Sequence, residues 1–202
     1  MILRVTKYGE PILRTKGEPI TSFSKDLEAF AQDMIETMHA NNGVGLAAQQ
    51  VDRALQICIV DLSLAYPTQE HIDFEYTYDG RTPPLQLIMP LVIVNPHLQF
   101  VSKDKDIAPE GCLSFPSLEG DIKRHSSIRL EFQDIQGNPH QLDCNRFFAR
   151  VIQHEFDHLQ GVLYIDRMGK KDLKRLDPEL KKMKQLAQDK LQESDHLNPE
   201  PS

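Results

Sequence analysis

The apolar positions of the chain recur at helical spacing in two long stretches. One stretch follows Ser24, a suitable N-cap, and predicts a helix over about 25–40, which Asn41-Asn42-Gly43 would end. The other predicts a helix from Asn145, again a plausible N-cap, to 159 or 160, with Gly161 just beyond its end. The second helix is almost continuously apolar, so we expect it to lie at the centre of the fold.

A third stretch, near the C-terminus, combines an apolar stripe with many lysines. Asp177 as a cap, followed by Pro178 at the first helical position, predicts that this helix opens there. The stripe consists of Leu180, Met183, Leu186, Ala187 and Leu191. We expect residues 170–192 to pack as a basic helix on the domain formed by residues 1–169, and residues 193–202 to be a disordered tail.

Several segments favour extended structure. Residues 56–61 and 91–100 are rich in β-forming residues and predict strands, the second interrupted by Asn95-Pro96. Residues 122–124 and 127–132 together alternate between apolar and polar positions and predict one half-exposed strand. After the central helix, residues 162–165 predict a short extended run.

Residues 62–90 show little periodicity and predict a long surface excursion, with a hairpin around Asp79-Gly80. Together these elements predict a single α+β domain. We expect short antiparallel β-sheets to surround a central helix, with a further helix at the C-terminus.

Composition limits the functions that are open to the chain. Its 202 residues suffice for one domain with a substantial core, and it lacks the roughly 20 consecutive apolar residues of a membrane span. The first residues show no signal peptide, so we expect a cytoplasmic protein. The net charge of −7 argues against DNA binding. Residues 170–190 are an exception, since eight Lys or Arg there oppose four Asp or Glu.

The central helix carries the clearest chemical signal, the pattern His-Glu-x-x-His. Residues i and i+4 lie on one face of a helix, so His154 and His158 can bind one metal ion together. Glu155 lies beside them and is placed to act on a water at the metal. Phe147 and Val151 lie on the same stripe. The alternative is a pair of histidines that are merely hydrogen-bonded in the core, and the glutamate between them disfavours it.

A catalytic site of this kind needs a third protein ligand. Tyr164 occupies the place, three residues after Gly161, where extended metalloprotease patterns carry another histidine. Glu179 is an acidic candidate downstream, but it belongs to a lysine-rich, solvated helix. Upstream, Cys112 offers a thiol in a loop, and a metal-bound thiolate is a strong ligand. A zinc endopeptidase with a downstream ligand is therefore the weaker hypothesis.

A glycine-rich segment, residues 43–50, lacks the Lys-Ser/Thr of a phosphate-binding loop. We interpret it as a tight loop whose backbone comes close to another group, with Gln50 at the edge of the site.

Three segments of the chain, in this order, resemble the three motifs of the peptide deformylase family. They are residues 43–50 (GVGLAAQQ), 110–114 (EGCLS) and 153–158 (QHEFDH). The resemblance extends over roughly residues 3–167. In two features the chain departs from the common bacterial pattern. The excursion over residues 62–90 is longer, and Glu119 stands where many members carry an arginine.

The resemblance implies a metal ion with water as its fourth ligand, held by Cys112, His154 and His158. The ion is most often Fe2+ in this family, with Zn2+, Ni2+ or Co2+ as substitutes. The resemblance also implies that Glu155 is the general base and later the acid. It assigns the Gln50 amide and the Leu113 N–H to the oxyanion that develops on the formyl group.

For the substrate, the resemblance implies N-formylmethionyl nascent peptides, which are hydrolysed to formate and a free N-terminal methionine. Val44, Phe147 and Val151 would line the methionine pocket, while Gly45 and Glu110 would contact the peptide or brace the loops. The basic segment 170–190 is either a solvated face or a contact with the ribosome. An inactive, ribosome-associated relative is a further alternative, which the intact set of site residues disfavours.

Overall fold

The computed structural model describes residues 1–68 and 72–197, with residues 191–197 as backbone only. The helices of this part are α1 (Lys25–Ala40), α2 (Leu85–Ile88), α3 (Arg146–Leu159) and α4 (Lys170–Leu197). The strands are β1 (Gly45–Ala47), β2 (Ile57–Val60), β3 (Tyr76–Tyr78), β4 (Leu91–Phe100), β5 (Lys105–Cys112), β6 (Phe115–His125), β7 (Ser127–Gln133) and β8 (Pro139–Asn145). Helix and strand are mixed in one α+β architecture, as predicted.

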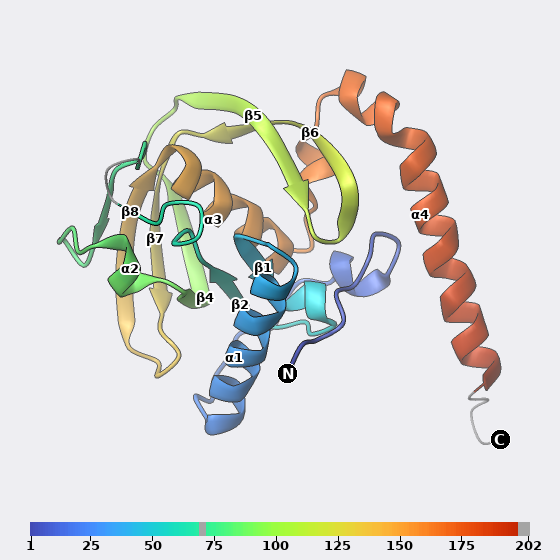
Figure 1. Cartoon of the computed structure of the whole chain (residues 1–202), viewed down its shortest axis with the longest axis horizontal. Coiled ribbons are helices and arrows are strands. Elements are labelled where there is room, and N and C mark those ends of the chain that lie inside the picture. The colour runs from blue at the N-terminus through green and yellow to red at the C-terminus, as the bar shows by residue number, and fades with distance from the viewer. Residues whose placement is uncertain (69–71, 198–202) are drawn as a thin grey trace.

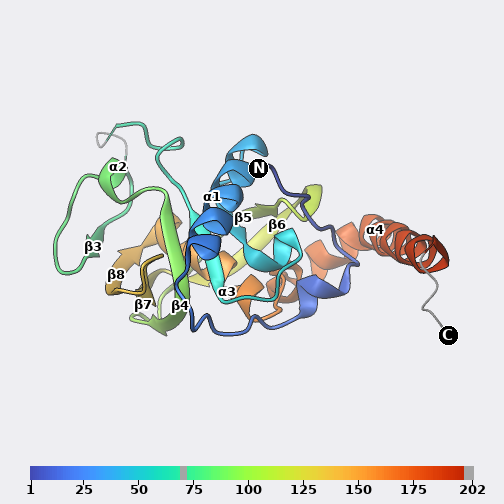
Figure 2. The ribbon, with the colours of Figure 1, turned by 90° about the horizontal axis from the view of Figure 1, so that it is seen from below.

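The strands form two antiparallel sheets on either side of α3. Six strands pair in the order β1-β2-β4-β7-β8-β3, and β5 pairs with β6 in a separate hairpin. Helix α3 lies between the large sheet and this hairpin (Figures 1 and 2). Consequently β1 is an edge of the large sheet and β5 has a free edge in the small one, and both edges lie near the central helix.

At strand β2, both faces of the large sheet are covered by helices. Cys58 and Val60 belong to the core cluster that contains α3, while Ile57 and Ile59 belong to the cluster that contains α1. All four side chains are buried, so the continuous apolar run of β2 is explained by helices on both sides. The predicted boundaries of α1 and α3 are confirmed. At α1, the Ser24 hydroxyl accepts a hydrogen bond from the Leu27 N–H.

The sequence break at Asn95-Pro96 bends β4 without ending it. Asn95 has a φ of 50°, and the register of β4 against β7 shifts between Val94 and His97. The Asn95 side chain accepts a hydrogen bond from the N–H of Ile20 and donates one to its carbonyl oxygen, which ties the segment before α1 to the bulge.

Two predictions about strands are wrong. Residues 122–124 and 127–132 are not one strand, because the first segment ends β6 in the hairpin and the second forms β7 in the large sheet. Residues 162–165 do not form an extended run, since a 3-10 helix occupies Tyr164–Arg167. Tyr164 and Ile165 are buried there in the cluster beneath the hairpin, so tertiary packing determines their conformation.

The excursion over residues 62–90 is more than a surface loop. Its strand β3 pairs with β8, and Phe74, Tyr76 and Leu85 are buried in the main core. The predicted turn at Asp79-Gly80 is confirmed, with positive φ at both residues and Tyr78 bridged to Arg81.

The prediction for the start of the last helix is also wrong. Helix α4 begins at Lys170, and Pro178 lies within it. Leu176 and Leu180, on either side of the proline, are both buried in the cluster beneath the hairpin, and this packing compensates for the hydrogen bond that proline cannot donate. Of the predicted stripe, Leu180 and Ala187 are buried, Leu186 is exposed, and the side chain of Leu191 lies outside the described residues. The backbone of 193–197 continues the helix where a disordered tail is predicted, and residues 198–202 lie outside the described part.

Candidate metal centre

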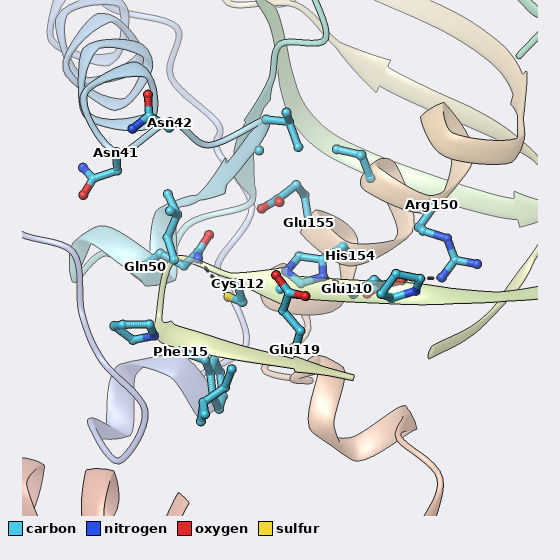
Figure 3. A pocket seen from close by; sticks show the side chains of 18 of the residues that line it. Asn41, Asn42, Gln50, Glu110, Cys112, Phe115, Glu119, Arg150, His154 and Glu155 are labelled. Atoms are coloured by element: carbon cyan, nitrogen blue, oxygen red, sulfur yellow. Dashed lines mark hydrogen bonds and ion pairs between the residues drawn. The ribbon is translucent and has the colours of Figure 1, made fainter. Parts of the chain in front are cut away.

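The hairpin presents alternate residues of β5 to α3 and to the outside. Glu110 is buried and hydrogen-bonded to His154 of α3, whereas Gly111 faces outward. Cys112 ends β5 and is paired with Phe115 across the tip of the hairpin. The cysteine therefore lies at the end of a strand, and the prediction of a loop position is wrong. Because the strand holds it, its thiol points into a cavity in front of α3 (Figure 3).

The three predicted metal ligands converge at this point. The thiol sulfur of Cys112 lies 3.3 Å from Nε2 of His158, and one ligand atom from each of Cys112, His154 and His158 lies within 4.8 Å of the others. A tetrahedral ion with bonds of about 2.0–2.3 Å requires separations of this size. The donor set and its geometry therefore fit a single divalent metal ion, with room on the cavity side for a further ligand.

Glu110 orients one of the histidines. Its carboxylate lies 3.0 Å from Nδ1 of His154, which leaves Nε2 of that ring to face the metal position. The same carboxylate accepts two hydrogen bonds from Arg124, at 2.9 and 2.8 Å, and one from Arg150 at 2.8 Å. Burial by itself raises the pKa of Glu110, but the bonds from Arg124 and His154 outweigh it and hold this pKa well below its usual range. The site thus has a permanent negative charge behind His154.

Asp157, one helical turn beyond His154, extends this network. It pairs with Arg124 in the interior and with Arg167, the last residue of the 3-10 helix. His158 differs from His154, because its Nδ1 is buried and has no hydrogen-bond partner among the described residues. Burial and the neighbouring His154 lower the pKa of His158 well below the usual value. This shift favours neutral His158, and imidazole binds a metal in its neutral form.

Glu155 is buried beside the ligands and carries an unpaired oxygen. Its Oε2 has no hydrogen-bond partner among the described residues, and its side chain is only 4% exposed. Burial raises the pKa of Glu155 to about 7. Gly45 packs directly against it, since a Cβ atom at that position would lie 2.2 Å from Oε1. The expectation that the glycine-rich loop comes close to another group is therefore explained by the carboxylate of Glu155.

Gln50 is held in one orientation at the opposite side of the cavity. Its Oε1 accepts the N–H of Ala47 at 2.9 Å, so its amide nitrogen is directed toward Cys112, 3.4 Å from the sulfur, and toward the hydroxyl of Ser114. A donor thus points to the place where a substrate oxygen would lie beside the metal.

The cavity in front of the metal position has a volume of about 510 Å³. Of the eleven predicted site residues, all except His158 line this cavity: Val44, Gly45, Gln50, Glu110, Cys112, Leu113, Phe147, Val151, His154 and Glu155. Arg150 and Lys7 also line it and were not predicted as site residues. The only available signal for Arg150 was that it interrupts the apolar run of residues 147–152, and its partners lie far away in the sequence.

A buried glutamate beside one thiol and two imidazoles, at the wall of a substrate-sized cavity, defines a mononuclear metallohydrolase. Within that class, comparison with known proteins identifies the family. The chain belongs to the polypeptide deformylase family, whose model matches residues 2–174. Members of this family are metal-dependent hydrolases that remove the N-formyl group from nascent peptides, and this is the activity of the chain.

The individual relatives are similar over almost their full length. Peptide deformylase of Opitutus terrae is 46% identical, over 93% of this chain and 95% of the relative. Among solved structures, a plant peptide deformylase has 30% identity and a TM-score of 0.79, with 93% of this chain and 92% of the other covered. The peptide deformylase of Plasmodium falciparum has 31% identity and a TM-score of 0.74, with 89% and 94% covered. The resemblance found in the three motifs is thereby confirmed. Among the described residues, no helix has both the length and the apolar character needed to cross a membrane.

Proposed function

We propose that Cys112, His154 and His158 hold Fe2+ in the cell and that the chain uses it to deformylate N-formylmethionyl nascent peptides. The observation that carries this proposal is the convergence of one thiol and two imidazoles beside a buried carboxylate. This ligand set suits Fe2+, and also Zn2+, Ni2+ or Co2+. When bound, the ion polarises the formyl oxygen and brings the pKa of a water toward about 7.

Glu155 is proposed as the general base and acid. Glu155 lines the cavity beside the metal position, and a pKa of about 7 allows the carboxylate to accept a proton and return it near neutral pH. The proton then goes to the amine that leaves as the new N-terminus. Gln50 and the backbone N–H of Leu113 would donate to the formyl oxygen as negative charge develops on it. Such donors contribute about 3 kcal/mol each in other hydrolases.

The two free sheet edges favour an extended peptide. Within the described residues, β5 pairs only with β6, and β1 pairs only with β2. A substrate strand between these edges would find unpaired backbone groups on both sides, as in β-strand addition. The methionine side chain would then point toward α3, into the apolar wall formed by Val44, Phe147 and Val151.

The test is formate release from formyl-Met-Ala-Ser by protein that is purified anaerobically and loaded with iron. We expect one bound metal per chain and rapid turnover. Glu155→Ala should retain the metal and lose nearly all turnover, whereas Cys112→Ala should lose the metal. Failure of the iron-loaded protein to release formate would overturn the proposal. Equal activity per bound metal for iron and zinc would overturn the assignment of Fe2+.

A zinc endopeptidase is disfavoured by the geometry. Glu179, the downstream ligand it would need, is exposed on α4, and the metal-binding group found within residues 1–68 and 72–197 consists of Cys112 and the two histidines.

We further propose that the enzyme acts in the cytoplasm and that α4 contacts the ribosome. In support, all the lysines from Lys170 to Lys190 are exposed, so they are available to phosphates. Co-sedimentation with ribosomes should weaken steeply as salt rises. A variant with Lys181 and Lys182 changed to Gln should bind less than a variant with the same change at Lys16 and Lys25, which lie outside α4. Equal binding by the two variants would contradict this contact.

A further inference from the structure

The outer face of the hairpin carries one acidic side chain that lines the cavity. Glu119 on β6 is paired with Gly111 on β5, and both face away from α3. A Cβ atom on Gly111 would lie 3.5 Å from Cγ and 3.9 Å from Oε1 of Glu119. The Glu119 side chain therefore extends over the glycine toward the free edge of β5. Figure 3 shows its carboxylate directed from β6 across the neighbouring strand.

The carboxylate of Glu119 differs from the other acidic groups of the cavity in being both exposed and without a partner. Within the described part of the chain, neither a hydrogen bond nor an ion pair forms to it. Arg175 bonds only the backbone oxygen of Glu119, at 3.0 Å. By contrast, Glu110 is saturated by two arginines and a histidine, and Glu155 is buried against Gly45. Glu119 thus contributes an exposed carboxylate without a direct ion-pair partner to the lining of the cavity.

The geometry of an extended substrate decides which of its residues meets this charge. Successive side chains of a strand point to opposite faces. If the methionine side chain points toward α3, the side chain of the next residue points outward, to the face on which Glu119 lies. We propose that Glu119 makes the enzyme prefer a lysine or arginine directly after the formylmethionine. This inference rests on the proposed binding of the peptide along β5.

The experiment compares formyl-Met-Lys-Ser, formyl-Met-Ala-Ser and formyl-Met-Glu-Ser as substrates of the iron-loaded enzyme. An exposed charge pair contributes about two- to fivefold in binding, and a like-charge pair opposes binding to a similar extent. The ratio of kcat/KM for the lysine peptide to that for the glutamate peptide should therefore be on the order of tenfold, with the difference mainly in KM. Raising the salt concentration should reduce the ratio.

Variants locate the origin of the preference. Glu119→Gln should bring the lysine-to-glutamate ratio close to one, and Glu119→Lys should reverse it. For each variant, kcat/KM for the charged peptides is divided by kcat/KM for the alanine peptide, so that a general change in activity cancels. Glu131→Gln is the matched control, because it removes an equally exposed charge from β7 in the other sheet, and it should leave the wild-type ratio unchanged.

The outcomes separate this inference from the proposed function. No turnover of the alanine peptide by the wild type would mean that the proposed function fails. Turnover without a preference for lysine, or a preference that survives in Glu119→Gln, would overturn the role of Glu119 and leave the proposed function intact.

Discussion

Glu110→Gln tests the idea that one buried carboxylate both fastens the hairpin to α3 and orients a metal ligand. Glutamine keeps the shape of the side chain and removes its charge. It leaves Arg124 and Arg150 without a charged partner that each contacts at 2.8–2.9 Å, and it can no longer accept all the bonds that Glu110 receives. Breaking a buried ion pair in this way costs about 3–5 kcal/mol. Arg124 retains Asp157 and Arg150 retains Asp106, so we expect a loss of about 3 kcal/mol in the free energy of unfolding, at the lower end of that range.

The same change should weaken metal binding through His154. Loss of the group that orients a ligating histidine typically lowers metal affinity by about 10- to 100-fold. Affinity is measured by competition with a chelator, and stability by denaturant unfolding of metal-free protein. Asp143→Asn is the matched control, because Asp143 also makes a two-point contact with an arginine, Arg129, but both side chains are partly exposed. This control should cost less than about 1 kcal/mol and leave metal affinity unchanged. If the two variants lost equal stability, or if Glu110→Gln bound metal as tightly as the wild type, the assigned role of Glu110 would be wrong.

The pH dependence gives an independent check on Glu110. Although burial raises its pKa, the bonds from Arg124 and His154 lower it further, so that in the folded state it is below the ordinary value of 4.5. The stability that this group contributes is therefore complete above about pH 4.5 and is lost as the pH falls toward the folded pKa. The difference in unfolding free energy between wild type and Glu110→Gln should be constant from pH 6 to 8 and should shrink below pH 4.5. A difference that grows on acidification would contradict the sign of the shift.

Two further substitutions test other parts of the molecule. Gly45→Ala places a Cβ atom 2.2 Å from the carboxylate of Glu155, the proposed general base, and should lower kcat/KM about 100-fold. Gly169→Ala, whose Cβ would meet no atom within 4 Å, should leave kcat/KM unchanged, and equal rates for the two variants would refute the close packing at Gly45. Burial lowers the pKa of His140, but its bonds with Asp79 and Asp134 outweigh this and raise it above 6.5. Its stabilising effect is therefore full below pH 6.5 and is lost as the pH rises through the raised pKa, so wild type should exceed His140→Gln in unfolding free energy at pH 6 by more than at pH 9.

The helices were predictable from sequence because their signals are local. The cap at Ser24, the apolar spacing and the residues that end α1 all lie within one segment. The apolar spacing of α3 is local too, although the side chain of its N-cap Asn145 bonds Glu75 and not the helix. Strand β5 was missed for the opposite reason. Its inward positions include Asp106 and Glu110 where an ordinary strand would carry apolar residues, so no alternation marks it. Arg150 of α3 pairs with the half-exposed carboxylate of Asp106 and with the buried one of Glu110, a contact across 40 or more residues that no sequence window contains.

The residues of the site likewise fall into those that local sequence predicts and those that depend on tertiary packing. His154 and His158 were predictable because the helix fixes their spacing, and Cys112 came from the resemblance of a short motif. The roles of Arg124 and Arg150 in the network behind the ligands were not predictable, since they depend on how the hairpin docks on α3. The early start of α4 was missed because the burial of Leu176 outweighs the usual preference of proline for a helix start.

The placement of one proposed metal ligand on the hairpin and two on α3 has a consequence for dynamics. A two-stranded hairpin is at best marginally stable alone. Here it is attached to α3 by the buried arginine network and, when an ion is bound, by the bridge between Cys112 and the histidines. Because a ligand that binds only the docked form stabilises that form, metal removal should increase hydrogen exchange of the β5 and β6 amides.

The hairpin β7–β8 provides the internal control for this prediction. It belongs to the six-stranded sheet and carries no metal ligand, so its exchange should change far less when a chelator removes the ion. The two hairpins can be followed in the same sample by mass spectrometry of peptides. Equal loss of protection in both would mean that the metal stabilises the fold as a whole. Loss confined to β5 and β6 would show that the ion binds a docked hairpin selectively and so assembles the cavity wall that carries Leu113.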